Sequence, residues 1–184
     1  MYIQQTIQWI NSFVIELNLC PFAKREMEKD PARIQVSAST TVENGLIDFM
    51  VEIECLNLDK TIDTSLLLFP HLFSDFFEYL DFVYLANIML VQARYKGVYQ
   101  LATFHPNYCF EGASVDDVTN YTNRSPYPML HILREESLDH AIAYYGNTEA
   151  IPKNNIIRLQ NLGLDEVKKS LEKVMEVNAA AKKS

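Results

Sequence analysis

The chain has 184 residues, 48% of them hydrophobic and 22% charged, which is an ordinary composition for one folded domain. Its 16 Lys and Arg residues against 24 Asp and Glu residues give a formal net charge of -8, which repels phosphate backbones and anionic lipids. No apolar stretch is long enough to span a bilayer, and the first residues lack a secretory signal. We therefore expect a soluble cytoplasmic protein, one domain over residues 1–184, that binds neither nucleic acid nor membrane.

Apolar residues recur at helical spacing from Ile3 to Leu19, so the chain begins with a predicted amphipathic helix, which Pro21 ends. Apolar and polar side chains then alternate over residues 34–39. That period predicts a strand with one polar face, which we expect at the edge of a sheet. Thr40-x-x-Glu43 has the form of a capping box, and it predicts a helix that continues to about residue 56.

Residues 65–69 are apolar on both faces of a strand, as expected of the central strand of a covered sheet. A long helix is predicted from Leu72 to about Tyr95. Its expected inner face consists of Phe73, Phe76, Leu80, Val83, Asn87 and Val91. Residues 98–105 predict a third strand, which Pro106 ends.

The remaining residues predict helices at 126–144, 148–162 and 164–177, with Gly146 and Gly163 at the breaks and a frayed tail at 179–184. The fold class is therefore α/β or α+β, with a small three-stranded parallel or mixed sheet, helices packed on it and a helical C-terminal third. Further strands and antiparallel pairing are left open.

Four segments together resemble a known family: Asn18-Leu-Cys-Pro-Phe-Ala23, Thr64-Ser-Leu-Leu-Leu-Phe-Pro70, Phe104-His-Pro-Asn-Tyr108 and Thr122-Asn-Arg-Ser-Pro-Tyr-Pro-Met-Leu-His-Ile-Leu-Arg-Glu135. Over nearly its whole length the chain resembles the bacterial family catalogued as domain of unknown function 1415. The resemblance implies a single compact domain and supplies no activity to transfer. Cys109 stands where members of that family tend to carry a different polar residue, which counts against Cys109 as a metal ligand.

The segment 122–135 is the most informative for function. Its prolines fit the first turn of a predicted helix, and His131, Arg134 and Glu135 would follow on one helix face. An imidazole beside a guanidinium and a carboxylate suits anion binding and proton transfer. The predicted substrate-binding residues are Asn123, Arg124, Ser125, Arg134 and Glu135. The alternative is that these side chains cap the helix and hold neighbouring loops in place.

His105 is a second candidate, because ligands of open parallel sheets bind beyond the carboxyl ends of strands. The hypothesis is that the loop after His105 and the helix start near Arg124 face one cleft, with His131 and His105 as catalytic residues. A histidine at a strand end can equally hold a loop by bonding a carbonyl group.

Cys20 can be interpreted as a nucleophile or as a buried thiol that closes the first helix, and the second interpretation is favoured because a helix carboxyl end disfavours a thiolate. A metal site could be drawn from Cys20, His105, Cys109 and His131, but the spacing matches no zinc signature, so we predict no metal. The five glycines are too scattered for a Rossmann fingerprint or a P-loop. No cofactor is expected.

The leading hypothesis is a protein that binds a small anionic metabolite, with an enzymatic role left open. Arg124 and Arg134 would hold the anion, and His131 or His105 would transfer a proton. The alternative is a non-catalytic interaction module that presents its acidic surface to a partner or to a second copy in a homo-oligomer.

Overall fold

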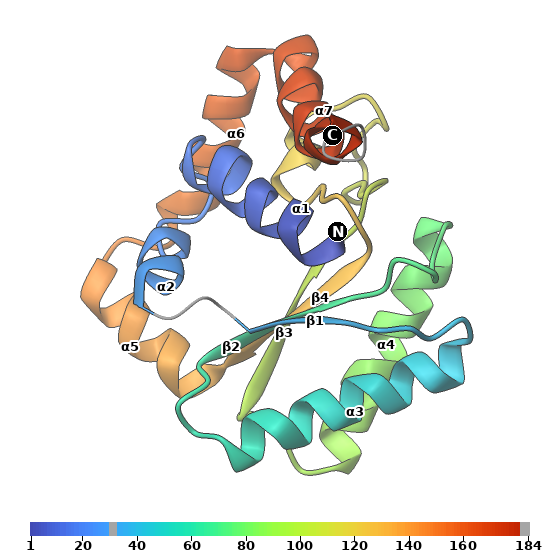
Figure 1. The fold of residues 1–184 in the computed structure, drawn as a ribbon. Coiled ribbons are helices and arrows are strands. Elements are labelled where there is room, and N and C mark those ends of the chain that lie inside the picture. The colour runs from blue at the N-terminus through green and yellow to red at the C-terminus, as the bar shows by residue number, and fades with distance from the viewer. Residues whose placement is uncertain (30–32, 181–184) are drawn as a thin grey trace.

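The structure is a computed structural model that describes residues 1–29 and 33–180 (Figure 1). In chain order its elements are α1 (Tyr2–Trp9), the π-helix η1 (Ile10–Ile15), α2 (Ala23–Lys29), β1 (Arg33–Val36), α3 (Val42–Leu58), β2 (Thr64–Leu68), α4 (Phe76–Gln92), β3 (Tyr99–Phe104), the 3-10 helix η2 (Val118–Thr122), β4 (Met129–Arg134), α5 (Glu135–Tyr145), α6 (Ala150–Leu162) and α7 (Leu164–Ala180).

The described strands form one mixed sheet in the order β1-β2-β4-β3. β1 pairs with β2 in parallel, whereas β4 is antiparallel to both β2 and β3. Of the two predicted possibilities, parallel or mixed, the sheet is mixed, and the edge strand near residues 34–39 and the buried strand near 65–69 are confirmed. The predicted number of three strands is wrong, because β4 supplies a fourth between β2 and β3.

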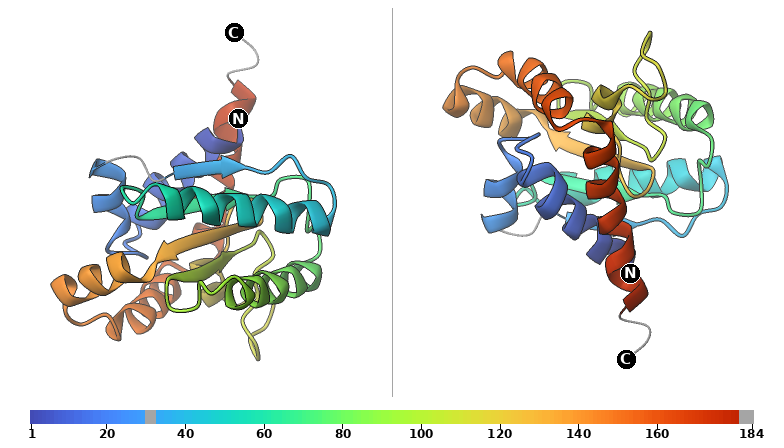
Figure 2. Two further views of the ribbon diagram at one scale, coloured as in Figure 1. Left: turned by 90° about the horizontal axis from the view of Figure 1, so that it is seen from below. Right: turned by 90° about the horizontal axis from the view of Figure 1, so that it is seen from above.

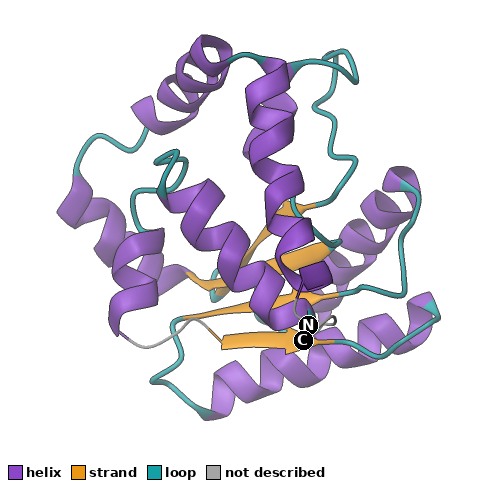
Figure 3. Cartoon of the chain, turned by 45° about the horizontal axis from the view of Figure 1, so that its top comes forward, coloured by secondary structure: helices purple, strands orange, loops and turns teal. Residues whose placement is uncertain are grey.

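Helices cover both faces of the sheet (Figure 1). Seen from below, α3 and α4 form the outer layer on one face; seen from above, α1 and α7 cross the other (Figure 2). Figure 3 shows the sheet between these two layers. One apolar cluster joins the sheet to α3 and α4, and a second joins it to α1, η1, α6 and α7. Burial of these two clusters is the main stabilising term of the fold.

β4 contributes side chains to both apolar clusters, because successive side chains of a strand point to opposite faces of the sheet. Leu130 and Ile132 pack beneath α3 and α4, and Met129 packs on the opposite face. The same alternation places Arg134 on the α3 side of the sheet and His131 on the α1 side. This separation decides how the predicted site is arranged.

The helix predicted at 126–144 is wrong over its first half: residues 129–134 are strand β4, and only α5 is helical. The Pro128 carbonyl accepts the Phe69 amide hydrogen at 2.9 Å, which begins the pairing of this segment beside β2. A run buried on both faces lacks the two-residue polar alternation that identifies a strand, so periodicity alone did not separate the two structures.

The predicted inner face of α4 is also wrong for three of its six residues. Tyr79, Phe82, Ala86 and Leu90 are the residues that α4 buries. Leu80, Asn87 and Val91 point outward instead. Because α4 is apolar around most of its circumference, its composition did not indicate which side faces the sheet.

The start of α3 and the ends of α5 and α6 lie close to the residues that the sequence predicts. The side chain of Thr41, rather than Thr40, caps α3 by accepting the Asn44 amide hydrogen at 3.3 Å. Gly146 and Gly163 end α5 and α6 with φ of 87° and 79°, conformations that favour glycine. Part of the predicted frayed tail, residues 181–184, lies outside the described residues. Within the described ranges, none of the helices is long and apolar enough to cross a membrane.

Candidate functional site

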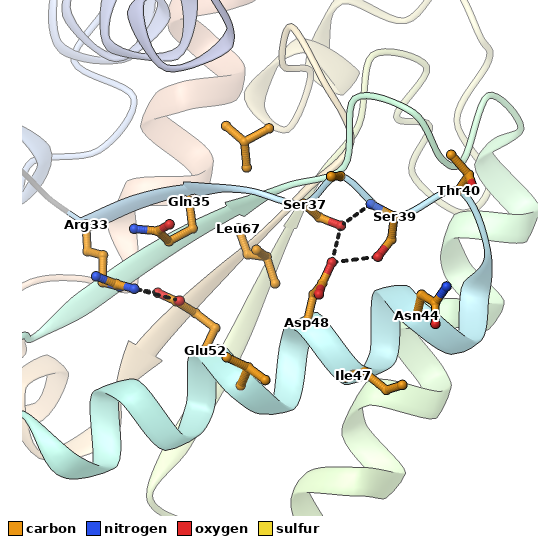
Figure 4. A pocket seen from close by; sticks show the side chains of 13 residues that line it. Arg33, Gln35, Ser37, Ser39, Thr40, Asn44, Ile47, Asp48, Glu52 and Leu67 are labelled. Atoms are coloured by element: carbon orange, nitrogen blue, oxygen red, sulfur yellow. Dashed lines mark hydrogen bonds and ion pairs between the residues drawn. The ribbon is translucent and has the colours of Figure 1, made fainter.

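An open groove of about 580 Å³ runs along the edge of the sheet, between β1 and α3. Its walls are the first strand, the loop that follows it and one side of the helix (Figure 4). The lining residues are Arg33, Gln35, Val36, Ser37, Ala38, Ser39, Thr40, Asn44, Ile47, Asp48, Val51, Glu52 and Leu67. The groove therefore follows β1 from its first residue, Arg33, into the loop after Val36, at the edge of the sheet.

A carboxylate with two hydroxyl donors stands at one end of the groove. Asp48 accepts hydrogen bonds from the hydroxyls of Ser37, at 2.5 Å, and Ser39, at 2.6 Å, both on Oδ2 (Figure 4). The Ser39 amide donates in turn to the Ser37 hydroxyl oxygen at 3.1 Å. Oδ1 of Asp48 accepts no hydrogen bond from the residues that the structure describes. This end of the groove therefore offers a negatively charged acceptor to a ligand.

An ion pair stands at the other end. Arg33 donates to Glu52 twice, from Nε at 2.6 Å and from Nη2 at 3.2 Å. Glu52 is buried and also accepts the hydroxyl hydrogen of Ser65. The hydrogen bond to Glu52 raises the pKa of Arg33 above its usual range, so the guanidinium stays charged. In the described part of the chain no partner takes Nη1 of Arg33, which therefore remains a positively charged donor.

The two ends are about one helical turn apart. Asp48 and Glu52 are four residues apart on α3, which places their Cβ atoms roughly 6 Å from each other on one face. Between the ends, Leu67 forms part of the floor, and Ile47 and Val51 are exposed on the helix wall. The groove thus combines a donor and an acceptor of opposite charge with apolar surface between them.

Arg134 does not take part in the groove, because its guanidinium donates hydrogen bonds to backbone carbonyl groups. Nη2 donates to the carbonyl oxygens of Leu56 at 2.6 Å and Ile62 at 3.1 Å, at the end of α3 and in the following loop. Nη1 donates to the Tyr99 hydroxyl at 3.3 Å. The side chain is only 7% exposed. Arg134 is therefore the cation that closes the carboxyl end of a helix, where cations are favourable.

His131 lies on the opposite face of the sheet from Arg134. The Thr64 hydroxyl donates to the Ile132 carbonyl oxygen at 2.9 Å, so it accepts from Nε2 of His131, 2.5 Å away. Burial lowers the pKa of His131 to about 4, because the apolar surroundings disfavour the charged ring. His131 is neutral at pH 7 and is held with its Nε2 protonated.

His105 is 1% exposed, and both of its ring nitrogens are used by backbone groups. Nε2 lies 2.8 Å from the Phe73 carbonyl oxygen, and the Asn107 amide donates to Nδ1 at 3.0 Å. Because Nδ1 accepts, Nε2 must carry the proton. Burial lowers the pKa of His105 below its ordinary value. The ring ties β3 to the loop before α4.

The other predicted ligand residues hold the loops between β3 and β4. Arg124 donates to the carbonyl oxygens of Tyr108 at 3.2 Å and Val115 at 2.8 Å. Asn123 donates to the Thr103 carbonyl at 3.0 Å, and the buried Ser125 donates to the Tyr127 carbonyl at 2.7 Å. Glu135 begins α5, its amide bonded to the Val98 carbonyl. None of these side chains lines the groove.

The predicted convergence of His131, Arg134 and Glu135 on one helix face is therefore wrong. The side chains of His131 and Arg134 lie on opposite faces of the sheet, because the two residues are three positions apart in one strand. His105 and Arg124 do not line the groove, and their side chains bind backbone groups of the neighbouring loops.

Cys20 is half-buried, and desolvation raises the pKa of its thiol, which disfavours the thiolate that a nucleophile needs. Cys109 contacts the carbonyl oxygens of Phe110 and Ala113. Within residues 1–29 and 33–180, no three His, Cys, Asp or Glu side chains are grouped closely enough to hold a metal ion.

Comparison with known families agrees with the resemblance carried by the four segments. The family described as "Protein of unknown function (DUF1415)" matches residues 1–169. The chain belongs to the DUF1415 family. No curated protein and no solved structure matches this DUF1415 chain. The family membership covers α1 to the first part of α7, and therefore both walls of the groove.

Sequence reasoning missed Arg33, Asp48 and Glu52 in this DUF1415 protein. Part of the signal was present: two carboxylates four residues apart on a predicted helix share one face, and hydroxyl residues follow the predicted edge strand. What the sequence did not show is that the helix returns along the same edge of the sheet, with its carboxylates opposite Arg33.

Proposed function

We propose that the protein binds a small polar metabolite in the groove between β1 and α3. The observation that carries the proposal is the pair of unused groups of opposite charge, Oδ1 of Asp48 and Nη1 of Arg33, in an accessible cavity of metabolite size. A carboxylate of the ligand would accept from Arg33. An ammonium or hydroxyl group of the ligand would donate to Asp48.

The spacing of these two groups narrows the ligand class. Arg33 is bound to Glu52, which lies one helical turn from Asp48 on α3, so we expect a small ligand whose acidic group and donor group are a few bonds apart. Amino acids and short hydroxy acids have this form. The proposal keeps the small anionic ligand expected from the sequence, but it places the binding site in the groove and not around His131 and Arg134.

A thermal-shift screen tests the proposal. The panel comprises the twenty proteinogenic amino acids with lactate, malate and glycerate, each from micromolar to millimolar concentration. A ligand present at 100 times its Kd should stabilise the native state by about 3 kcal/mol, which raises Tm by roughly 5–10 °C for a domain of this size.

The variant Asp48→Asn provides the contrast. Its amide keeps an oxygen acceptor for Ser37 and Ser39 but replaces the free acceptor by a donor, so the ligand-induced shift should fall by at least half. Asp139→Asn, an exposed carboxylate on α5 outside the groove, should retain the full shift. Equal shifts in both variants would remove Asp48 from the site.

A second candidate is an extended peptide, and the free edge of β1 favours it. The Ser37 amide donates to the Leu68 carbonyl at 2.8 Å, so alternate residues from Arg33 to Ser37 face β2. The backbone groups of Ile34 and Val36 then point to the open edge, beside the exposed side of α3. Peptide addition would protect the Ile34 and Val36 amides from hydrogen exchange, which a bound amino acid would leave unchanged.

A further inference from the structure

The outward face of α4 is apolar. Five large side chains on it are exposed: Phe77 by 74%, Tyr84 by 68%, Val91 by 56%, Leu80 by 39% and Leu85 by 38%. Among the described elements, α4 packs chiefly against α3 and β3, both on its opposite side. A helix that is hydrophobic around its circumference normally has neighbours on all sides, so this face lacks the partner that its composition indicates.

The spacing of these residues is that of a helix that pairs with another helix. Phe77, Tyr84 and Val91 recur every seven residues, and Leu80 and Asn87 stand three residues after the first two. This is the a and d pattern of a two-helix seam. Asn87 is the one polar residue at these positions, and its side-chain amide donates to the Val83 carbonyl oxygen of the same helix at 2.8 Å.

The exposed area is of the size that an interface needs. The five side chains together present roughly 500 Å² of apolar surface, taking about 200 Å² for a whole aromatic side chain and somewhat less for an aliphatic one. A stable interface uses about 800 Å² on each partner. The polar residues that flank the seam would supply the remainder as a rim.

The charges along α4 identify the partner. Asp75, Glu78 and Asp81 lie at its amino end, and Arg94 and Lys96 follow its carboxyl end, all of them exposed. A second copy placed antiparallel sets the acidic end of each helix against the basic end of the other. A parallel arrangement would instead place like charges together.

We propose that the protein forms a two-fold symmetric dimer through antiparallel pairing of α4 with α4 of a second copy. The axis passes beside Tyr84, so that Phe77 of one copy faces Val91 of the other. Such an interface is self-complementary, as closed dimers require. The groove between β1 and α3 lies on the other side of α3 and stays open in both copies.

Sedimentation equilibrium of the full chain tests the dimer. The wild-type protein should sediment with twice the monomer mass of 21.2 kDa. Tyr84→Arg places two guanidinium groups face to face at the axis and should raise the dimer dissociation constant at least about 100-fold. Tyr144→Arg, at an 85% exposed tyrosine on α5, should leave the dissociation constant unchanged. A monomeric wild-type protein at 100 μM, or a dimer insensitive to Tyr84→Arg, would overturn the proposal.

Cysteine crosslinking tests the orientation. Under mild oxidation, a mixture of the variants Phe77→Cys and Val91→Cys should form a covalent dimer of one chain of each kind. Neither variant should crosslink to itself beyond the background of the native cysteines. Self-crosslinking of Phe77→Cys would show a parallel pair and would contradict the proposed arrangement.

Discussion

Replacing Arg134 by alanine should lower the free energy of unfolding by about 2–4 kcal/mol, because buried carbonyl oxygens then lose a charged hydrogen-bond donor. The variant leaves the Leu56 and Ile62 carbonyl oxygens without the donor that holds them, and it removes the cation from the end of α3. Urea denaturation followed by circular dichroism at 222 nm measures the change.

Two variants separate the effect of charge from that of the guanidinium hydrogen bonds and from the loss of an exposed arginine. Arg134→Lys keeps the charge but loses the forked donors of the guanidinium. We therefore expect its free energy of unfolding to lie between those of wild type and Arg134→Ala. Arg158→Ala removes an arginine that donates to a single exposed carbonyl, that of Asn18, and should cost about 1 kcal/mol or less. If Arg134→Ala were as stable as Arg158→Ala, the assignment of Arg134 to the framework would be incorrect.

Acidification from pH 7 to pH 4 should destabilise the protein through His131 by roughly 2–3 kcal/mol. The folded state holds the pKa of His131 at about 4, whereas an unfolded histidine titrates near the ordinary value of about 6.5. Between these values the unfolded chain binds more protons than the native chain. The stabilisation is therefore complete above about pH 6.5 and is lost as the pH falls toward 4.

The variant His131→Gln isolates this contribution. Urea midpoints measured at half-unit steps of pH should fall less steeply for His131→Gln than for wild type between pH 6.5 and 4. His140→Gln, at an exposed histidine of α5, should reproduce the wild-type slope. The lowered pKa of His105 also makes stability fall with falling pH, and it does so equally in wild type, His131→Gln and His140→Gln. Parallel curves for wild type and His131→Gln would show that His131 is accessible to protons in the native state.

Most of the fold was predictable because each element carries a local signal. The edge strand alternates, the buried strand β2 is apolar on both faces, and glycines end α5 and α6. Residues 126–134 were not predictable by this means. A strand buried on both faces and a helix with prolines in its first turn give similar sequences, and only pairing with β2 and β3 decides between them.

The site was less predictable, because it depends on which side chains face each other across elements. His131 and Arg134 would share one face of a helix, yet strand β4 directs them to opposite faces of the sheet, and Glu135 already belongs to α5. Arg33 and Glu52 are 19 residues apart, and their contact follows only from the crossover of α3 between β1 and β2. Long-range packing supplies that information.

The most direct test of the groove is an NMR titration. The protein, labelled with ¹⁵N, is titrated with the amino acid or hydroxy acid of the panel that gives the largest thermal shift. Binding in the groove predicts amide shift changes concentrated in residues 33–40 and 44–52, and their loss in Asp48→Asn. Changes centred instead on His105, Arg124 and His131 would contradict the groove as the ligand site.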